Sequence, residues 1–370
     1  MQPLTSPPPE PAPDGRAAVD VLHVITSTQR RGAETFAVDL ATALTARGLR
    51  SEVVALAPGQ GDTLDVPTLG DAPLSPATLR ALRRRAATAQ LVVAHGSRTL
   101  PACAAALVGG APVVYRSIGD PAAWAGHGLR RARTRLLLAR MAAVTVLWPE
   151  AGDSTRTLHH VPAERIHVIP NGVPAERCPV PDGEARRAAR RRLGLPADAP
   201  VVAVIGALGP EKRVEDAITA CAALDGVHLL VAGGGPGRAD LGRRAEAEAP
   251  GRVHFAGTLP GAGEALAATD VVVLASRTEG MPGVLIEAGL SGLASVATDV
   301  GGVAQIVRDG ETGLLVRPGD VAGLADGLRL ALAERERLGA AAQRHCLANF
   351  EIGAVADRWA TLASTLEQQT

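Results

Sequence analysis

Short apolar runs recur along the whole chain, and stretches with apolar residues at every third or fourth position separate them. In the first half these runs lie at residues 19–25, 52–56, 90–94, 111–115, 143–147 and 166–169. In the second half they lie at residues 201–205, 227–232, 253–255, 271–274, 295–298 and 314–316. Such runs are typical of buried parallel strands, and the stretches between them are typical of amphipathic helices. The alternation predicts an α/β fold with two doubly wound parallel sheets.

The two halves meet at a turn-rich stretch, Pro170-Asn171-Gly172-Val173-Pro174, which is typical of a domain boundary. We predict an N-terminal domain over residues 17–173, a C-terminal domain over residues 174–350 and a final helix within residues 351–370. Residues 1–16 are rich in proline and lack both the basic and the apolar region of a signal peptide, so they predict a disordered tail.

One corner of the second half has the features of a phosphate cradle. It lies in residues 276–292, between an apolar run and a helix that is expected to begin near Val284. Gly280 and Gly283 allow the backbone to approach a ligand closely, and Pro282 suits an early helical position. The N–H groups at the start of this helix would face an anion.

Two carboxylates, Glu279 and Glu287, flank this corner. Beside a phosphate, a carboxylate is better suited to accept hydrogen bonds from the neutral hydroxyls of a ribose or a sugar. Lys212 and Arg213 follow one strand of the same predicted sheet, and glycines at 233–235 follow another. Together these loops offer a cation for a diphosphate and glycine backbone for a base or ribose. Solvated glutamates at an ordinary corner remain the alternative for the carboxylate pair alone.

The first half offers two further candidates, each at the carboxyl end of a predicted strand. Gly32 stands at a strand-to-helix corner, and His95 directly follows the run 90–94. Ligands of open parallel sheets bind at these strand ends. A turn glycine and a structural histidine are the alternative interpretations.

Composition narrows the possible partners. The chain has 370 residues, with 38 Lys+Arg against 38 Asp+Glu, so it has no net charge that would attract nucleic acid or an anionic membrane.

Arginine-rich helices are expected near 79–88 and 129–140. They would suit anionic lipid head groups at the inner membrane surface, or would simply be solvated. No apolar span is long enough to cross a bilayer. Four well-separated cysteines without metal-ligand spacing are typical of reduced thiols in a cytoplasm.

From about Val19 to its end, the chain resembles the retaining, nucleotide-sugar-dependent glycosyltransferases of family 4. The most specific shared element is Glu279-x7-Glu287. Supporting motifs are Arg31-Gly32-Ala33-Glu34, Pro170-Asn171-Gly172-Val173, Pro210-Glu211-Lys212, Gly233-Gly234-Gly235-Pro236, Asp299-Val300-Gly301-Gly302 and Gly310-Glu311-Thr312-Gly313-Leu314-Leu315-Val316. The resemblance implies the GT-B fold, in which two Rossmann-like domains face each other across a cleft. It also implies that the last helix crosses back to the N-terminal, acceptor-binding domain.

The same resemblance implies roles for individual residues. Glu279 would hold the donor sugar, Glu287 the ribose hydroxyls and Lys212 the diphosphate. Gly32 would lie near the diphosphate and the acceptor, and His95 would face the transferred sugar. The implied donor-binding residues are Gly32, Lys212, Arg213, Gly233, Gly235, Glu279, Gly280, Met281, Pro282, Gly283, Val284, Leu285 and Glu287. The implied catalytic residues are His95, Glu279 and Lys212, with no bound metal and no cofactor.

The chain departs from the family pattern at several positions. Ala207 replaces an arginine that usually binds the diphosphate, and Arg213 or Arg116 could compensate. The usual serine is replaced around 147–148, the acidic residue of the glycine-rich loop is Gly234, and no Asp-x-Asp motif is present.

The resulting hypothesis is a retaining transfer of a hexose from a nucleoside-diphosphate sugar to an acceptor hydroxyl. The acceptor would be a glycan, a glycolipid or a small metabolite, as in polysaccharide biosynthesis. One alternative is a GT-B sugar-nucleotide epimerase, which needs no acceptor. The other is a non-catalytic nucleotide-sugar-binding protein, which Ala207 makes credible.

Overall fold

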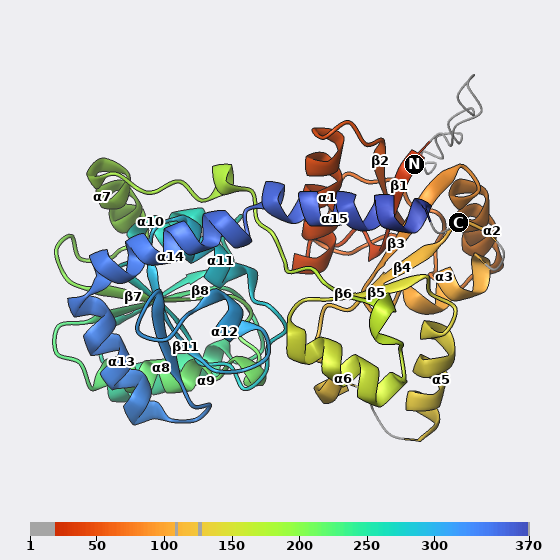
Figure 1. The fold of residues 1–370 in the computed structure, drawn as a ribbon. Coiled ribbons are helices and arrows are strands. Elements are labelled where there is room, and N and C mark those ends of the chain that lie inside the picture. Colours follow the sequence, from red (N-terminus) through yellow and green to blue (C-terminus); the bar gives the residue numbers. More distant parts are fainter. Residues whose placement is uncertain (1–18, 108–109, 125–127, 369–370) are drawn as a thin grey trace. The chain divides into compact units, whose positions relative to one another are not determined.

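The computed structural model describes residues 19–107, 110–124 and 128–368, and these form two units (Figure 1). The first unit contains the chain up to Gly172 and returns from Ile352 onward, and the second unit spans Val173–Glu351. The tail predicted for residues 1–16 lies outside the described residues. Each unit is built around its own parallel sheet, as the alternation of apolar runs predicted.

The first unit contains a six-stranded parallel sheet in the order β2-β1-β3-β4-β5-β6. Its strands are β1 (Val19–Ser27), β2 (Ser51–Ala57), β3 (Ala89–His95), β4 (Val113–Arg116), β5 (Ala143–Val146) and β6 (Ile166–Val168). Its helices are α1 (Gly32–Thr45), α2 (Pro76–Ala86), α3 (Leu100–Ala106), α4 (Pro121–Trp124), α5 (Leu129–Leu138), α6 (Pro149–His159) and α15 (Ile352–Glu367).

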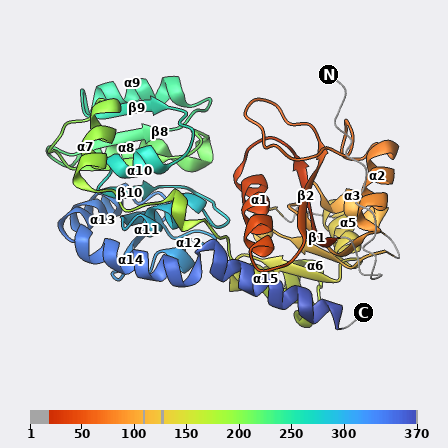
Figure 2. The same ribbon diagram turned by 90° about the horizontal axis from the view of Figure 1, so that it is seen from above.

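Helices α1 and α15 lie side by side on one face of this sheet (Figures 1 and 2). Phe36, Leu40 and Leu44 recur at four-residue spacing, so they form one apolar stripe on α1 that packs against the strands. Trp359 and Leu362 of α15 are buried in the same cluster. The apolar stripe of α15 therefore makes the last helix part of the first unit.

The second unit contains a six-stranded parallel sheet in the order β12-β11-β10-β7-β8-β9. Its strands are β7 (Val201–Ile205), β8 (His228–Ala232), β9 (Val253–Gly257), β10 (Val271–Leu274), β11 (Ala294–Thr298) and β12 (Gly313–Val316). Its helices are α7 (Gly183–Arg192), α8 (Val214–Ala222), α9 (Arg238–Glu248), α10 (Gly263–Ala268), α11 (Gly283–Leu290), α12 (Val303–Ile306), α13 (Val321–Ala333) and α14 (Arg335–Asn349). One core cluster joins the sheet to α8, α9 and α13, and another joins it to α7 and α10.

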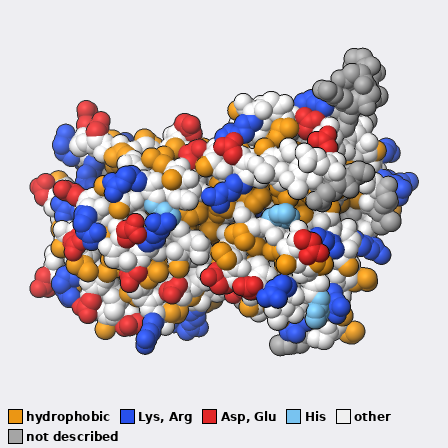
Figure 3. All heavy atoms as spheres, viewed as in Figure 1, with side chains coloured by type: hydrophobic (Ala, Val, Ile, Leu, Met, Phe, Trp, Pro, Cys, Tyr) orange, Lys and Arg blue, Asp and Glu red, His pale blue; other side chains and the backbone are white. Residues whose placement is uncertain are grey.

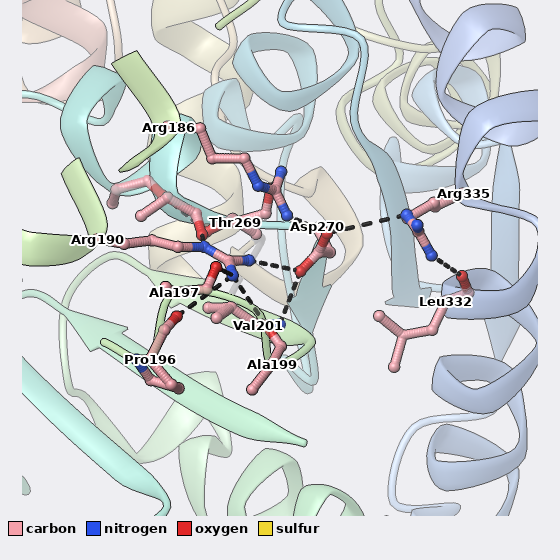
Figure 4. A network of polar contacts seen from close by, with 12 residues as sticks. Arg186, Arg190, Pro196, Ala197, Ala199, Val201, Thr269, Asp270, Leu332 and Arg335 are labelled. Atoms are coloured by element: carbon pink, nitrogen blue, oxygen red, sulfur yellow. Dashed lines mark hydrogen bonds and ion pairs between the residues drawn. The ribbon is translucent and has the colours of Figure 1, made fainter. Parts of the chain in front are cut away.

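A buried ion-pair network fastens α7 to the amino end of β10 (Figure 4). The Asp270 carboxylate accepts hydrogen bonds from Arg190 Nη2 and from the Val201 backbone N–H, both at 2.8 Å, and it also pairs with Arg186. The Arg190 guanidinium donates further to the carbonyls of Ala197 and Ala199, at 2.7 and 2.9 Å. The network therefore pairs a buried cation at the amino end of β10, at the opposite end of this strand from the corner that leads into α11.

The charged side chains on the surface agree with the equal numbers of basic and acidic residues in the sequence. Charged side chains of both signs are interspersed over the face shown in Figure 3. All four cysteines are buried and free. Among the described helices, none combines the length and the apolarity that crossing a bilayer requires.

Candidate active site

The corner between β10 and α11 brings Lys212 and Glu279 together. Lys212 Nζ lies 2.6 Å from Glu279 Oε1, and the Ser276 hydroxyl donates to the same oxygen at 2.6 Å. The Glu279 side chain is 9% exposed and that of Lys212 is 27% exposed. The residues predicted to hold the sugar and the diphosphate of one donor are thus direct neighbours, at the carboxyl ends of β7 and β10.

The loop after β11 fixes this corner in place. The Thr298 hydroxyl donates to the Ser276 carbonyl at 2.6 Å, and the Gly302 N–H donates to the Gly280 carbonyl at 2.7 Å. Gly301 has a φ of +56°, and a Cβ there would collide with the Glu279 carbonyl oxygen. Glycine is therefore needed at 301 for both its conformation and its close contact. These contacts hold the backbone around Glu279, and Ser276 and Lys212 hold its side chain.

Lys212 is the only lysine in the chain, and the other 37 of its 38 basic residues are arginines. An ammonium is a compact charge on a flexible stem, whereas a guanidinium is a planar fork. The basic side chain that pairs with Glu279 is therefore the flexible amine rather than a guanidinium fork.

Arg213 is engaged elsewhere. Its backbone is left-handed, with a φ of +50°, and its guanidinium bonds to the Asp216 carboxylate at 2.7 and 2.9 Å. Glu215 adds a second ion pair at 2.9 Å. Asp216 also raises the pKa of Arg213. The charge of Arg213 is therefore balanced by the first turn of α8, and Ala207 is exposed at the end of β7 without a cation in its place.

The start of α11 is open to a ligand. Its N-cap, Pro282, makes no side-chain hydrogen bond to the first turn, and a Cβ added at Gly283 would meet nothing within 4 Å. The first backbone N–H groups of a helix lack intrahelical partners and favour an anion. Met281 and Leu285 are buried, so any contact that they make to a donor would come from their backbone. Glu287 is half-buried on the same helix.

Gly233 and Gly235 lie too close to the backbone of the loop after β7 to carry a side chain. Gly233 has a φ of +148°, and its Cβ would collide with the Gly206 carbonyl oxygen. A Cβ at Gly235 would crowd the backbone of Leu208, whose N–H donates to the Gly234 carbonyl at 3.0 Å. These two positions therefore need glycine for packing against the loop after β7. Their predicted contact with a donor stays a prediction.

In the first unit, His95 ends β3 and is buried. His95 Nε2 lies 3.0 Å from His23 Nδ1, and His23 Nε2 lies 3.0 Å from the Ser51 hydroxyl. Burial, and then the neighbouring His23 and Arg116, hold the pKa of His95 well below its usual value. His95 is therefore a neutral imidazole whose Nε2 is already occupied. The Nδ1 atom has no hydrogen-bond partner among the described residues, so it is the nitrogen available to a ligand.

Sequence reasoning did not select several residues that shape these sites. They are Ser276 and Thr298 around Glu279, and His23 behind His95. Gly301 and Gly302 were named as part of a family motif, but no role beneath the loop was predicted for them. Ser276 lies three residues before Glu279, a spacing that local hydrogen bonding could have suggested. His23 offers no such signal, because it occupies an inward position of a strand.

Comparisons with known proteins identify the family of the chain. The family model described as Glycosyl transferases group 1 matches residues 185–345, and the model described as Glycosyltransferase Family 4 matches residues 30–177. The alpha-D-kanosaminyltransferase of Streptomyces kanamyceticus is 32% identical over 260 residues, which cover 67% of this chain and 64% of that protein. The D-inositol 3-phosphate glycosyltransferase of Nocardia farcinica is 36% identical over 196 residues, which cover 49% of this chain and 43% of that protein. The chain thus spans less than two thirds of the length of these relatives.

Solved structures show the same fold. Anabaena Alr3699/HepE, crystallised in complex with UDP-glucose, superposes with a TM-score of 0.81 at 22% identity, covering 94% of this chain and all of that one. WaaG, a glycosyltransferase involved in lipopolysaccharide biosynthesis, superposes with a TM-score of 0.71 at 19% identity. The match covers 93% of this chain and 99% of the WaaG chain. With the two family models and the two doubly wound sheets, these matches establish that the chain belongs to the GT-B glycosyltransferases of the family 4 type.

Proposed function

We propose that this protein is a retaining glycosyltransferase that moves a hexose from a nucleoside-diphosphate sugar to an acceptor hydroxyl. The observation that carries the proposal is the contact of Lys212 with Glu279 beside the uncapped start of α11. A cation, a carboxylate and free backbone N–H groups at one corner match a phosphate joined to a sugar. Support also comes from HepE, which was solved with UDP-glucose and with UDP.

In the proposed reaction, Lys212 leaves Glu279 and pairs with the donor diphosphate. Glu279, still held by Ser276, then accepts hydrogen bonds from hydroxyls of the sugar. The bond between the anomeric carbon and the diphosphate oxygen breaks, and a bond from that carbon to the acceptor oxygen forms on the same face. The acceptor proton passes to the diphosphate oxygen. Lys212 and the N–H groups of α11 stabilise the negative charge that develops on the leaving group.

The test begins with a thermal-shift screen against UDP, GDP, ADP and their sugar conjugates, because a ligand that binds the folded protein raises its melting temperature. Release of the nucleoside diphosphate is then measured with and without candidate acceptors. A transferase releases it only when an acceptor is added, whereas an epimerase converts the donor without one. A scaffold protein would bind the donor without turnover.

Two variants sharpen this test. Glu279→Gln should lower the rate of transfer by about 100-fold or more, since the carboxylate that orients the sugar is lost. Glu211→Gln is the matched control, because it neutralises an exposed carboxylate beside Lys212. Equal rates in both variants, with both proteins folded, would rule out the assigned role of Glu279.

We further propose that α5 meets an anionic membrane at the cytoplasmic face, which would suit a lipid-linked acceptor. Leu129 and Leu136 on this helix are 91% and 62% exposed, and arginines stand between them. Exposed apolar side chains flanked by cations are typical of interfacial helices. Co-sedimentation with vesicles of phosphatidylglycerol, and none with phosphatidylcholine alone, is the expected result. Unchanged sedimentation of a Leu129→Ser, Leu136→Ser double variant would refute this role.

A further inference from the structure

Three polar side chains form a hydrogen-bonded chain across neighbouring strands of the first unit. His23 of β1 lies between Ser51 of β2 and His95 of β3. His23 Nδ1 is 3.0 Å from His95 Nε2, and His23 Nε2 is 3.0 Å from the Ser51 hydroxyl. The strands follow one another in the order β2-β1-β3, so the chain crosses the sheet and ends at the carboxyl end of β3, at His95.

This chain lies among apolar side chains. His23 and His95 are 0% and 2% exposed. Val21, Leu91 and Val93 stand two residues along the same strands, so they share a face of the sheet with the two histidines, and all three belong to the core under α1 and α15. A buried polar ring costs free energy unless its polar atoms are hydrogen-bonded, and an apolar side chain would avoid that cost. Packing alone therefore does not account for a histidine at position 23.

The protons of this chain can be arranged in two ways. Burial is the main reason that the pKa of His23 is lowered to about 3 and the pKa of His95 well below its usual value, so both rings are neutral. A neutral imidazole has one N–H donor and one acceptor nitrogen. Because the two rings are joined, either both carry the proton on Nε2 and donate toward Ser51, or both carry it on Nδ1 and donate away from Ser51. Nδ1 of His95 is an acceptor in the first arrangement and a donor in the second.

The charge of Arg116 favours the first arrangement. The strand order β1-β3-β4 places His23 and Arg116 on opposite sides of His95, and the register pairs His95 with Arg116 directly. Burial lowers the pKa of Arg116 to about 9, so it stays a cation at neutral pH, and its charge also lowers the pKa of both rings. The negative end of a neutral imidazole dipole is the nitrogen without a proton, and a cation favours the tautomer that turns this end away from the other ring and toward itself.

We propose that His23 and Ser51 are positioning residues that hold His95 in the tautomer with its proton on Nε2, so that Nδ1 accepts a hydrogen bond from a hydroxyl group of a sugar substrate. Nδ1 of His95 has no hydrogen-bond partner among the described residues, and it lies at the carboxyl end of a parallel strand, where ligands of such sheets bind. The hydrogen bond at one ring nitrogen sets the proton on the other. The contact with a sugar rests on the proposed transferase function, whereas the tautomer does not.

The direct test is a long-range 1H–15N spectrum of the histidine rings at neutral pH, which distinguishes a nitrogen that carries a proton from one that does not. The chain has nine histidines, and the signals that disappear in His95→Gln and in His23→Leu assign these two rings. The expected result is a protonated Nε2 and an unprotonated Nδ1 in both. A proton on Nδ1 of His95, or equal amounts of its two tautomers, would overturn the proposal.

Ser51→Ala tests whether the outer end of the chain sets the tautomer. Without the hydroxyl, the Nε2–H of His23 loses its acceptor, so the arrangement with both protons on Nδ1 becomes more favourable. The ring signals of His23 and His95 should shift toward that tautomer, whereas Ser51→Thr, which keeps a hydroxyl, should give the wild-type spectrum. An unchanged His95 signal in Ser51→Ala would overturn the role of Ser51.

The second unit offers a matched control for these spectra. His228 Nδ1 lies 3.0 Å from His254 Nε2, the same pair of atoms at the same distance as in the first unit. His228→Leu should therefore leave the ring signals of His95 and the rate of transfer unchanged. A change in the His95 signals as large as that in Ser51→Ala would overturn the assignment of the effect to the chain of His23 and Ser51.

His23→Leu and His23→Asn test the consequence for transfer with two side chains of similar shape. Leucine cannot accept a hydrogen bond from His95 Nε2, whereas the amide oxygen of asparagine can replace Nδ1 of His23. His23→Leu should lower kcat about tenfold without changing the affinity for the nucleoside diphosphate, and His23→Asn should restore most of the rate. Equal rates in the two folded variants, or a parallel loss of nucleotide affinity, would overturn the positioning role.

The two kinds of measurement separate this inference from the proposed function. If the wild type transfers no sugar to any acceptor, the proposed function fails. The ring spectra of the wild type and of Ser51→Ala still decide whether His23 and Ser51 set the tautomer of His95, because they need neither donor nor acceptor.

Discussion

The buried pair of His23 and His95 predicts that mild acid destabilises the first unit. His23 is fully buried, and its two ring nitrogens are occupied by His95 and by Ser51, each at 3.0 Å. Burial, and secondarily the charge of Arg116, lowers the pKa of His23 from 6.5 to about 3. The folded protein therefore keeps His23 neutral at a pH where an unfolded histidine is already protonated.

The sign and size of the effect follow from this difference. Because the folded pKa is lowered, the stability that His23 contributes is fully present above pH 6.5 and is lost as the pH falls toward 3. In that window the unfolded chain binds one proton more than the folded chain, so the free energy of unfolding falls by about 1.4 kcal/mol per pH unit. Between pH 6.5 and pH 5 the loss from His23 alone is about 2 kcal/mol.

The assay compares the wild type with His23→Leu. Hydrogen exchange of the β1 and β3 amides at several pH values reports the stability of the first unit by itself, which a global melt of a two-unit chain does not. The variant should be less stable at pH 7, since His95 loses a partner. Below pH 6.5 its free energy of unfolding should fall less steeply with decreasing pH, because its unfolding takes up about one proton fewer. Parallel pH profiles for the two proteins would refute the claim that His23 is neutral in the fold.

Two further predictions concern the second unit. Ala207→Arg should tighten binding of the nucleoside diphosphate about tenfold by isothermal titration calorimetry, because it adds a cation to the loop after β7; unchanged affinity would place Ala207 away from the diphosphate. Asp270→Asn should cost about 3 to 5 kcal/mol in urea unfolding, since it leaves Arg190 buried without its counterion. Asp326→Asn, which breaks an exposed pair, should cost less than about 1 kcal/mol, and equal losses in both variants would contradict the network's role.

The fold could be predicted because its determinants are local. Each strand is a short apolar run, and each helix carries its own apolar stripe, as α1 does with Phe36, Leu40 and Leu44. The loop-to-helix corner at Gly280 to Gly283 could be predicted for the same reason, since its glycines and proline are close together in sequence, whereas its role as a phosphate cradle stays a prediction. Such signals need no knowledge of distant partners.

The pairing of side chains could not be predicted, because it depends on residues far apart in the chain. Lys212 meets Glu279 across 67 positions, and His23 meets His95 across 72. Arg213 is the instructive exception. Asp216 follows it by three residues, a spacing at which ion pairs are common on helices, so its engagement was visible in the sequence. The roles predicted for these residues stay predictions until they are measured.

In the function that we propose, Lys212 holds the diphosphate of a nucleotide-sugar donor. The most direct measurement is the affinity of the wild type and of Lys212→Ala for the best-binding nucleoside diphosphate and for the same nucleoside without phosphates. The Lys212→Ala variant should bind the diphosphate about 10- to 100-fold more weakly, because one charge-assisted contact is lost, and should bind the nucleoside as before. Equal weakening for both ligands, or no binding of any nucleoside diphosphate by the wild type, would contradict it.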